Sequence, residues 1–595
     1  MKNTILLIGL YITSFTALAG NLPIVTVGSG ANCDFDKIQD AINSSSDHLN
    51  IRLTNQEVFR ENIIISNNLR MVGGYNNCSD AVNNIPSDKR TTISGDINND
   101  SIGDGPVLLI SNGEDDVDSI QLSELKLING YQGITGFAQD GGGGISILNF
   151  TGAVQLRHMV ITGNSGSKGG GIAIKDGYAY LTIEDDTSIV NNSAVNGGGI
   201  WCSGVKNWIG YNFPANTTYA NIANNTATAD GGGVYLKLGC MMTVRPNQPE
   251  PDSINQAGSS NENKAGIAFN QANDNGGGVY LQSGAAIELG TVNGFDLDPN
   301  AIINISDNIA DNDNDGDGNG GGIYATDGTT TVVARNIHIG HNTAQFGGGI
   351  YLTSSAGFEI LPCSGSKNCN LINFNTGKIE AGGIYVNDSA QLHMVQTVFE
   401  DNRSDEATAI KLNQQAVAIL ASNVFSHNGA DGSLGLKDNY VIQIDNQSGL
   451  LSSFNTFADN HAKFAVFAIR GQSELQVQGN IIDDASTGDV IEISGENETT
   501  FRCLVVHESK SFSGNNILTG DPDFVNRAQR DYHIKPSSPA VDICSTESLI
   551  FDYDIDGEFH AWDDPNTPFT KFIIADAGAD ETYASDIIFK DGFEQ

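Results

Sequence analysis

An alternating run of carboxylates is the first candidate for chemistry in this chain. The run places acids at every second position, with glycine at the sixth position as in a calcium-binding loop, and its acids are Asp311, Asp313, Asp315 and Asp317. The twelfth position is Gly322, where such a loop ordinarily has a bidentate glutamate. We expect calcium as the cofactor of these four aspartates. The alternative is an acidic, solvated loop between structural repeats.

Adjacent acidic pairs are the candidates for catalysis, namely Asp115-Asp116, Asp185-Asp186, Asp483-Asp484 and Asp563-Asp564. Glycosidic hydrolysis uses two carboxylates about 5 to 9.5 Å apart, which neighbouring structural repeats could supply. The chain contains neither Gly-His-Gly nor Arg-Ile-Lys, two sequences of one class of polysaccharide-cleaving enzyme, and its 10 histidines show no triad or metal-ligand spacing. We therefore assign no catalytic residue and keep a polysaccharide lyase or glycoside hydrolase as the alternative function.

Six aromatic residues recur at one position of a repeated phrase, just after glycine and an aliphatic residue, and they are Trp201, Tyr235, Tyr280, Tyr324, Tyr351 and Tyr385. If the repeats stack in register, these rings form a column on one outer face. Such a column could stack the sugars of a glycan or the side chains of a partner protein. The alternative is that the rings stabilise the sheet by stacking on each other.

Glycine runs place these residues in a stack of similar turns. The runs end at Gly144, Gly171, Gly199, Gly233, Gly278, Gly322, Gly349 and Gly383, so successive runs end 27 to 45 residues apart. A period near 27 with inserted loops is typical of a solenoid, whose repeats bury their apolar faces against their neighbours. Glycine is expected here where φ is positive or where repeats approach too closely for a Cβ atom.

Strands with a period of two follow the glycine runs. Val234, Leu236 and Leu238 are predicted to face inward, with Tyr235 and Lys237 facing out. A second phrase ends in asparagine, at Asn164, Asn192, Asn225, Asn308, Asn342, Asn402, Asn428 and Asn460. Asparagine tolerates left-handed backbone angles, and its amide can bind the backbone of neighbouring repeats.

These patterns predict an all-β fold, a right-handed parallel β-helix over residues 51–520. Residues 20–50 are predicted to form an N-terminal cap with one short helix, because Phe35, Ile38, Ala41 and Ile42 have helical spacing. Such a cap would cover the open first turn of the solenoid and prevent edge-to-edge pairing.

The first 19 residues have the features of a signal peptide, with Lys2, an apolar stretch and a small-x-small site at Ala17-Leu18-Ala19. We therefore expect an exported protein, and no later stretch is long and apolar enough to span a membrane. An even number of cysteines in an exported chain suggests disulfides, which we predict in sequential order as Cys33–Cys78, Cys202–Cys240, Cys363–Cys369 and Cys503–Cys544. The net charge of −41 argues against nucleic acid as a partner.

The two phrases together resemble the repeats of the polymorphic outer-membrane proteins, over roughly residues 60–480. That resemblance implies a right-handed parallel β-helix of the pectin-lyase-like type that acts as a surface adhesin.

The C-terminal sequence resembles a choice-of-anchor Q domain over residues 521–582. The matching segments are Asp521-Pro522-Asp523-Phe524, Tyr532-His533-Ile534, Ser538-Pro539-Ala540-Val541-Asp542, Asp554-Ile555-Asp556-Gly557 and Asp576-Ala577-Gly578-Ala579-Asp580-Glu581. The resemblance implies a region that closes the β-helix. The last region is a tail, residues 583–595, whose segment Ile588-Phe589-Lys590-Asp591-Gly592-Phe593-Glu594 resembles a short C-terminal tail of many proteins exported by Gram-negative bacteria. The resemblance implies a sorting or attachment signal.

The sequence thus predicts a non-catalytic β-helix, secreted or held at the outer membrane or cell surface of a Gram-negative bacterium. Its expected partner is a glycan or a surface protein.

Overall fold

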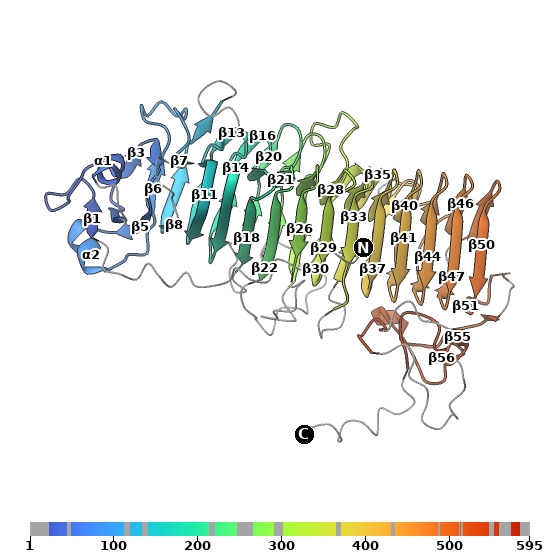
Figure 1. Ribbon diagram of the computed structural model, residues 1–595. Coiled ribbons are helices and arrows are strands. Elements are labelled where there is room, and N and C mark those ends of the chain that lie inside the picture. The colour runs from blue at the N-terminus through green and yellow to red at the C-terminus, as the bar shows by residue number, and fades with distance from the viewer. Residues whose placement is uncertain are drawn as a thin grey trace, which may run out of the picture.

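The protein is a parallel β-helix (Figure 1). The computed structural model describes residues 23–44, 49–111, 119–133, 141–213, 221–246, 266–290, 302–363, 370–429, 435–485, 488–510, 512, 516–546, 553–558 and 573–582. Its strands form a 28-stranded sheet, a 16-stranded sheet and four small sheets. Among the described residues, only two pairs are antiparallel, β53 (Phe524–Asn526) with β54 (Asp531–Ile534) and β55 (Cys544–Thr546) with β56 (Ile573–Ala575). The predicted signal peptide and C-terminal tail lie outside the described residues.

Each complete coil contributes up to four strands, which we call first to fourth in chain order. The 28-stranded sheet contains the first and the second strands, and β11 (Ile145–Arg157) and β14 (Ile172–Glu184) supply both in one strand. The first strands are β4 (Ile63–Ile65), β7 (Leu108–Ser111), β17 (Ile200–Ser203), β21 (Val234–Lys237), β25 (Val279–Leu281), β28 (Ile323–Ala325), β32 (Ile350–Leu352), β36 (Ile384–Val386), β40 (Ala407–Leu412), β43 (Tyr440–Ile444), β46 (Ala465–Arg470) and β49 (Asp489–Ser494). The second strands are β1 (Ile24–Val27), β2 (Leu49–Thr54), β5 (Leu69–Tyr75), β8 (Ser119–Ser123), β18 (Trp208–Phe213), β22 (Met241–Pro246), β26 (Ala286–Leu289), β29 (Thr331–Ala334), β33 (Gly357–Ile360), β37 (Gln391–Val395), β41 (Val417–Ala421), β44 (Gly449–Ser453), β47 (Glu474–Gln478) and β50 (Glu498–Arg502).

The third strands form the 16-stranded sheet, and the fourth strands form two short sheets. The third strands are β3 (Val58–Arg60), β6 (Thr91–Ser94), β9 (Leu125–Ile128), β12 (Val160–Thr162), β15 (Ser188–Val190), β19 (Asn221–Ala223), β23 (Gly266–Ala268), β27 (Ile303–Ser306), β30 (Ile337–Gly340), β34 (Asn370–Asn373), β38 (Thr397–Glu400), β42 (Val424–Ser426), β45 (Thr456–Ala458), β48 (Ile481–Asp483), β51 (Leu504–Val506) and β52 (Ile517–Thr519). The fourth strands are β10 (Tyr131–Gln132), β13 (Ser165–Lys168), β16 (Ser193–Asn196), β20 (Thr226–Ala227), β24 (Gln271–Ala272), β31 (Thr343–Phe346), β35 (Thr376–Glu380) and β39 (Arg403–Ser404).

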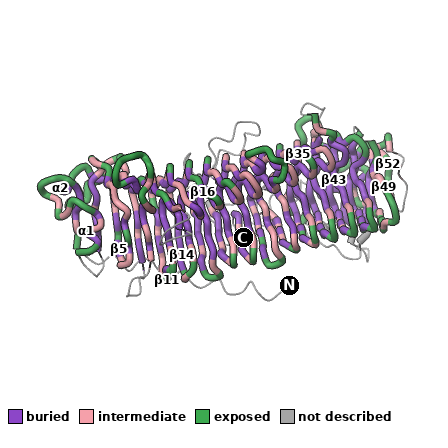
Figure 2. Tube along the Cα trace, turned by 90° about the horizontal axis from the view of Figure 1, so that it is seen from above, coloured by how far each residue is buried: buried purple, intermediate pink, exposed green. Residues whose placement is uncertain are grey.

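The interior of the coils is an aliphatic core that runs the length of the rod, whereas exposed residues gather at the turns (Figure 2). Val234 and Leu236 are fully buried in it, as predicted. The inward prediction for Leu238 is wrong, because this residue is 51 % exposed and has a φ of 51°. Leu238 begins the turn between the first and second strands, so the period of two has already ended there.

Close stacking of the coils explains the glycine runs. The first glycine has a positive φ in six of the eight runs, for example 67° at Gly276. The next two lack room for a side chain: a Cβ atom on Gly277 would lie 2.5 Å from the carbonyl oxygen of Ile309, and one on Gly278 would lie 2.6 Å from that of Gly322. Both predicted reasons for glycine are confirmed, and they apply to different positions of the run.

The asparagine residues form a buried ladder along the corner between third and fourth strands. At each step one amide oxygen accepts from the backbone N–H and the Nδ2 of the asparagine one coil earlier, both at 3.0 Å for Asn308 to Asn342. The Nδ2 of Asn308 also donates to the carbonyl oxygen of Ile267 at 2.9 Å. The left-handed backbone angle belongs to the preceding residue, such as Asp307, and not to the ladder asparagine. The ladder also includes Asn270 and Asn375, which were not predicted, and it ends on Asp484.

The N-terminal end of the rod carries two short helices (Figure 1). The predicted helix exists as α1 (Ile38–Asn43), which buries Ile38, Ala41 and Ile42, while Phe35 precedes it and pairs with Val27. A second helix, α2 (Cys78–Asn83), was not predicted; the side chain of Asn77 accepts from the backbone of Asp80 and caps it.

Disulfides join neighbouring parts of the chain as predicted for Cys33–Cys78, Cys202–Cys240 and Cys503–Cys544. Cys363 is also disulfide-bonded, but the predicted partner Cys369 lies outside the described residues. Cys202 and Cys240 are fully buried, and their bond links successive coils inside the core.

The described residues of 521–582, here called the C-terminal module, lie beside the last coils (Figure 1). The module contains β53 (Phe524–Asn526), the 3₁₀ helix η1 (Arg527–Gln529), β54 (Asp531–Ile534), β55 (Cys544–Thr546) and β56 (Ile573–Ala575). Its apolar residues, including Phe524 and Ala577, pack with Val424, Ile481 and Val505 on the outer face of the 16-stranded sheet. The module therefore covers a flank of the rod.

Candidate functional site

The aromatic residues stand in register on successive first strands. The pairing runs from Trp201 to Tyr235, Tyr280, Tyr324, Tyr351 and Tyr385. Successive tyrosine rings stack with centroids 4.7 to 5.3 Å apart and nearly parallel planes. The predicted column therefore exists.

Stacking occupies the faces of these rings. Trp201, Tyr235, Tyr280 and Tyr385 are all less than 9 % exposed. Two of the hydroxyl groups have partners too, since Gln282 donates to the hydroxyl of Tyr235 at 2.5 Å and Asn413 donates to that of Tyr385 at 3.1 Å. Burial raises the pKa of Tyr351 to about 12. This geometry supports a structural role for the column and leaves little ring surface for a ligand.

An ionic group that the sequence analysis missed continues the column. Lys411 is paired in register with Tyr385 and is 5 % exposed. Its ammonium lies 3.0 Å from a carboxylate oxygen of Glu380 and 3.3 Å from one of Asp445. The available signal was the alternation of Ile410, Lys411 and Leu412, which places the lysine on the outward face.

A recess lies at the turns between first and second strands. It is a groove of about 330 Å³ lined by Asp388, Gln414, Gln415, Asn446, Gln447 and Gly471. Each turn uses two successive left-handed residues, such as Gln414 and Gln415, so their side chains project from the same point of successive coils. Gln415 donates to Gln447 at 3.1 Å and Asn446 donates to Asn413 at 2.8 Å. The groove is thus a row of amides and one carboxylate, suited to hydroxyl groups.

The acidic loop lies between the fourth-strand position and the glycine run. Asp311, Asp313 and Asp315 place ligand atoms within 4.8 Å of one another. Burial works to raise the pKa of Asp311, but hydrogen bonds from Gly316, Gln345 and Lys378 hold it below its usual value. A shared hydrogen bond with Asp315 raises the pKa of Asp317 to about 6. Lys378 already neutralises Asp311 at 3.1 Å, so the repulsion that a cation could relieve lies among the other three acids.

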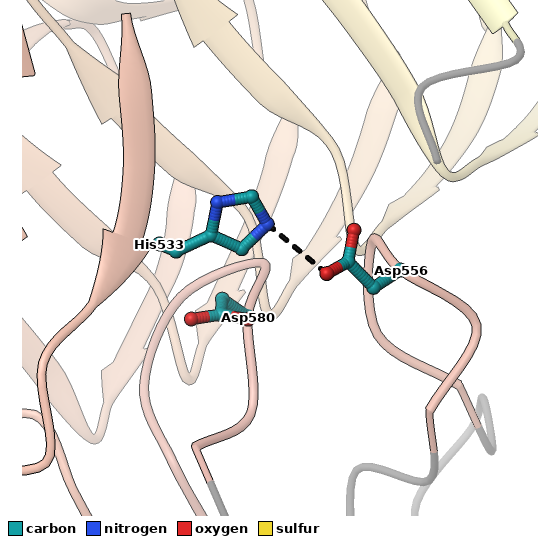
Figure 3. Close-up of side chains that lie close together, drawn as sticks. All are labelled: His533, Asp556 and Asp580. Carbon is teal, nitrogen blue, oxygen red and sulfur yellow. Dashed lines mark ion pairs between the residues drawn. The ribbon is translucent and has the colours of Figure 1, made fainter. Parts of the chain in front are cut away.

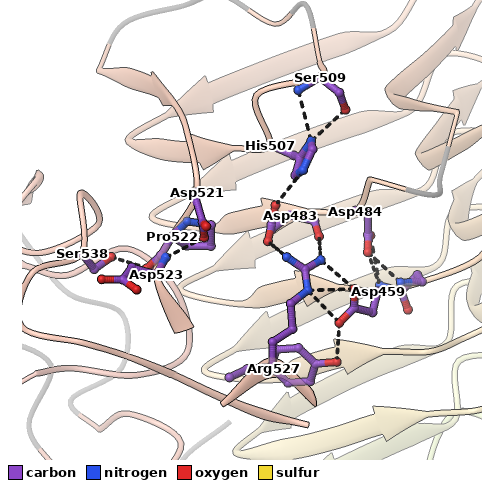
Figure 4. A network of polar contacts seen from close by, with 12 residues as sticks. Asp459, Asp483, Asp484, His507, Ser509, Asp521, Pro522, Asp523, Arg527 and Ser538 are labelled. Carbon is purple, nitrogen blue, oxygen red and sulfur yellow. Dashed lines mark hydrogen bonds and ion pairs between the residues drawn. The ribbon is translucent and has the colours of Figure 1, made fainter. Parts of the chain in front are cut away.

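The adjacent acidic pairs that the structure describes have basic or amide partners. Asp185 pairs with Arg157 at 2.7 Å, and Asp186 pairs with Arg90 and with His158. Arg527 of the C-terminal module pairs with Asp483 and donates through Nε to Asp459 at 3.0 Å, while Asp484 accepts from Asn460 (Figure 4). The pairs at Asp115-Asp116 and Asp563-Asp564 lie outside the described residues. The described pairs serve as ion pairs and caps.

Acidic residues of the C-terminal module hold its loops together. Asp554 accepts from the backbone of Asp556 and Glu558, at 3.0 and 2.7 Å. Asp576 accepts from the backbone of Asp542 at 2.7 Å, and Glu581 accepts from that of Asp576 at 3.0 Å. Burial raises the pKa of Asp554 to about 6 and that of Glu581 to about 10. These acids therefore connect the loops of a module that has little regular structure, through hydrogen bonds from backbone N–H groups.

No protein-family model matches the chain, and no curated protein is significantly similar to it. In the part of the chain that the structure describes, no helix has the length and apolarity required to cross a membrane. The described disulfides fit an exported protein.

Proposed function

We propose that the protein is an exported β-helix of the adhesin kind, which binds an uncharged glycan in the polar groove at the first-to-second-strand turns. The observation that carries this proposal is the row of exposed amide side chains on successive turns. Coils repeat at the strand spacing of about 4.8 Å, so the row presents the same hydrogen-bonding groups along one direction, as a repeating polymer requires. The net charge of −41 disfavours polyanionic sugars.

The test is a glycan and matrix-protein array with the exported full chain, followed by calorimetry of the hits. The variant Gln414→Ala/Gln415→Ala/Gln447→Ala should lose at least tenfold in affinity, because truncation removes several hydrogen bonds to the ligand. Ser283→Ala changes the same corner of an upstream coil and should bind normally. Binding that survives the triple variant would place the site elsewhere, and hits confined to matrix proteins would replace the glycan by a protein partner.

A polysaccharide lyase is the second candidate, favoured by the group of Lys411, Glu380 and Asp445 beside Tyr385. A basic residue next to carboxylates is an arrangement that such chemistry uses, although Lys411 is almost fully buried and its ammonium is ion-paired with both acids. Unsaturated uronate released from acidic polysaccharides, and lost in a folded Lys411→Met variant, would favour the enzyme over the binding protein.

We also propose that calcium binds to the acidic loop through Asp313, Asp315 and Asp317. Bound calcium would replace the proton of the hydrogen bond between Asp315 and Asp317, which raises the pKa of Asp317 to about 6, and would relieve the repulsion among these acids. Millimolar calcium should raise the melting temperature by a few degrees in the native chain and leave Asp315→Asn/Asp317→Asn unchanged. Equal melting temperatures with calcium and with chelator in the native chain would remove this site.

A further inference from the structure

Three segments of the C-terminal module bring one histidine and two aspartates together (Figure 3). His533 comes from β54, Asp556 from the turn after Asp554, and Asp580 from the segment after β56. One ligand atom from each lies within 4.8 Å of the other two. Asp556 and Asp580 are well buried, with side-chain exposure of 7 % for Asp556. The convergence is therefore built by the fold and not by chance proximity at the surface.

The imidazole of His533 is oriented as in many metal sites. Its Nδ1 contacts Asp531 at 2.5 Å, so the other ring nitrogen points toward Asp556. A carboxylate on the far nitrogen is the usual second-shell partner of a metal-binding histidine, because it fixes the tautomer and raises the basicity of the ligand. The Nε2 atom is buried and lies 3.2 Å from Asp556 at ion-pair distance, without the alignment of a hydrogen bond.

The backbone holds the two aspartates in place. Asp580 accepts from the backbone N–H of Ile534 at 2.8 Å, next to His533 itself. The N–H of Asp556 donates to Asp554 at 3.0 Å. The carboxylates of Asp531, Asp556 and Asp580 thus lie around a single imidazole, and burial raises the pKa of Asp580 to about 7. The local charge is negative even when the ring is protonated.

We infer that His533, Asp556 and Asp580 form a binding site for one divalent transition-metal ion of the Zn²⁺ type. A nitrogen and two carboxylate oxygens suit Zn²⁺, whereas calcium prefers oxygen ligands alone. On binding, the ion takes the Nε2 lone pair, and any proton on that nitrogen leaves to the solvent. The ion would tie three segments of a module whose described strands form only two two-stranded sheets.

The alternative for the same atoms is a metal-free ion pair. Contact with Asp556, above all, raises the pKa of His533 to about 9, so an imidazolium can stand between Asp531 and Asp556 at neutral pH. The two states differ in a measurable way, because only metal binding consumes Zn²⁺ and releases the proton.

The experiment is calorimetric titration of the disulfide-bonded full chain with Zn²⁺ at pH 7.5, in two buffers of different ionisation enthalpy. We expect one saturable site per chain with a dissociation constant of about 1 μM or below, release of about one proton, and a higher melting temperature. Binding should weaken at least tenfold in His533→Gln. Asp580→Asn keeps an acceptor for Ile534, so it should fold normally and also bind at least tenfold more weakly.

His158 provides the matched control, because it also lies between two aspartates, at 2.6 Å from Asp186 and 3.4 Å from Asp185. Those acids already pair with Arg90 and Arg157, so His158→Gln should bind Zn²⁺ like the native chain. Co²⁺ in place of Zn²⁺ should give a visible absorption band that His533→Gln lacks. Absence of saturable binding at micromolar Zn²⁺, or binding unchanged in both His533→Gln and Asp580→Asn, would overturn the site in favour of the ion pair.

Discussion

Single residues in this rod are constrained by the coil on either side. Asp484 shows this best, because it is the last member of the asparagine ladder and is fully buried. Burial raises its pKa to about 7, while the amide donors of Asn460 oppose the shift. Asp459 and Asp483 add to the increase, so the neutral form of Asp484 is favoured in the folded state.

The folded pKa of Asp484 lies above the unfolded value of about 3.9, so the folded state binds the proton more tightly than the unfolded state does. The resulting contribution to the free energy of unfolding is complete below pH 4 and is lost as the pH rises through 7. The loss amounts to at most about 4 kcal/mol. Asp484→Asn keeps the acceptor and cannot ionise, so its free energy of unfolding should fall less between pH 4 and pH 8. Urea denaturation at several pH values measures the free energy of unfolding of the native chain and of the variant. If the two free energies depend on pH in the same way, this account of Asp484 is refuted.

Replacing the glycine at the third position of a run should lower the stability of the fold. In Gly278→Ala the new Cβ atom would meet the carbonyl oxygen of Gly322, so we expect a loss of about 1–3 kcal/mol. Gly449 lies in β44 with no atom within 4 Å of an added Cβ, so Gly449→Ala should change stability by less than about 1 kcal/mol. Thermal melts of both variants test the difference, which should vanish if the glycine runs only supply flexibility.

At the scale of the strand, the tyrosine column behaves as part of the core. Tyr280 is 8 % exposed and stacks on Tyr235 and Tyr324 at 4.7 and 5.0 Å. Tyr280→Ser should therefore cost about 3–5 kcal/mol, whereas Tyr280→Phe keeps the ring and should cost less than about 1 kcal/mol. Denaturant unfolding measures the cost. If the Tyr280→Ser chain is folded and fully stable but loses ligand binding, the hypothesis that the aromatic column binds a ligand would be supported instead.

The elements were predictable where one interaction repeats in every coil. The glycine runs and the asparagine phrase carry the coil-to-coil contacts, so their recurrence predicted the parallel register and most of the ladder. Leu238 was assigned to the wrong environment because the end of a strand is set by turn geometry, which hydrophobic alternation does not report. Lys411 and the groove at Gln414 depend on which outward side chains meet across coils, and that requires the register. The acidic residues of the module could be assigned to sequence motifs but not to contacts, because their hydrogen bonds join segments that are distant in the sequence.

At the scale of the molecule, the C-terminal module is held to the rod by a covalent bond and by ion pairs. The Cys503–Cys544 disulfide links them, Arg527 contacts Asp459 and Asp483, and Arg530 contacts Asp401 at 2.6 Å. The disulfide closes a loop with a sequence separation of 41, which is worth about 4 kcal/mol on the entropic model.

Cys503→Ser/Cys544→Ser with Arg527→Gln should therefore release the module while the coils stay folded. Limited proteolysis should cleave the released variant between residues 503 and 546 much faster than the native chain. The matched control is Cys202→Ser/Cys240→Ser, which removes a disulfide inside the core and leaves the module attached. Equal cleavage rates in that region for native and released chains would show that packing against Val424 and Ile481 is sufficient to hold it.

The corner between second and third strands tolerates segments of very different length. The chain passes from β18 to β19 between Phe213 and Asn221, but from β22 to β23 between Pro246 and Gly266. The pairing of Ile222 with Ile267 and of Ile267 with Ile305 continues across both. Peptides grafted at this corner would be displayed at fixed intervals along a rigid axis, so the same scaffold can change what it presents without rebuilding its interior.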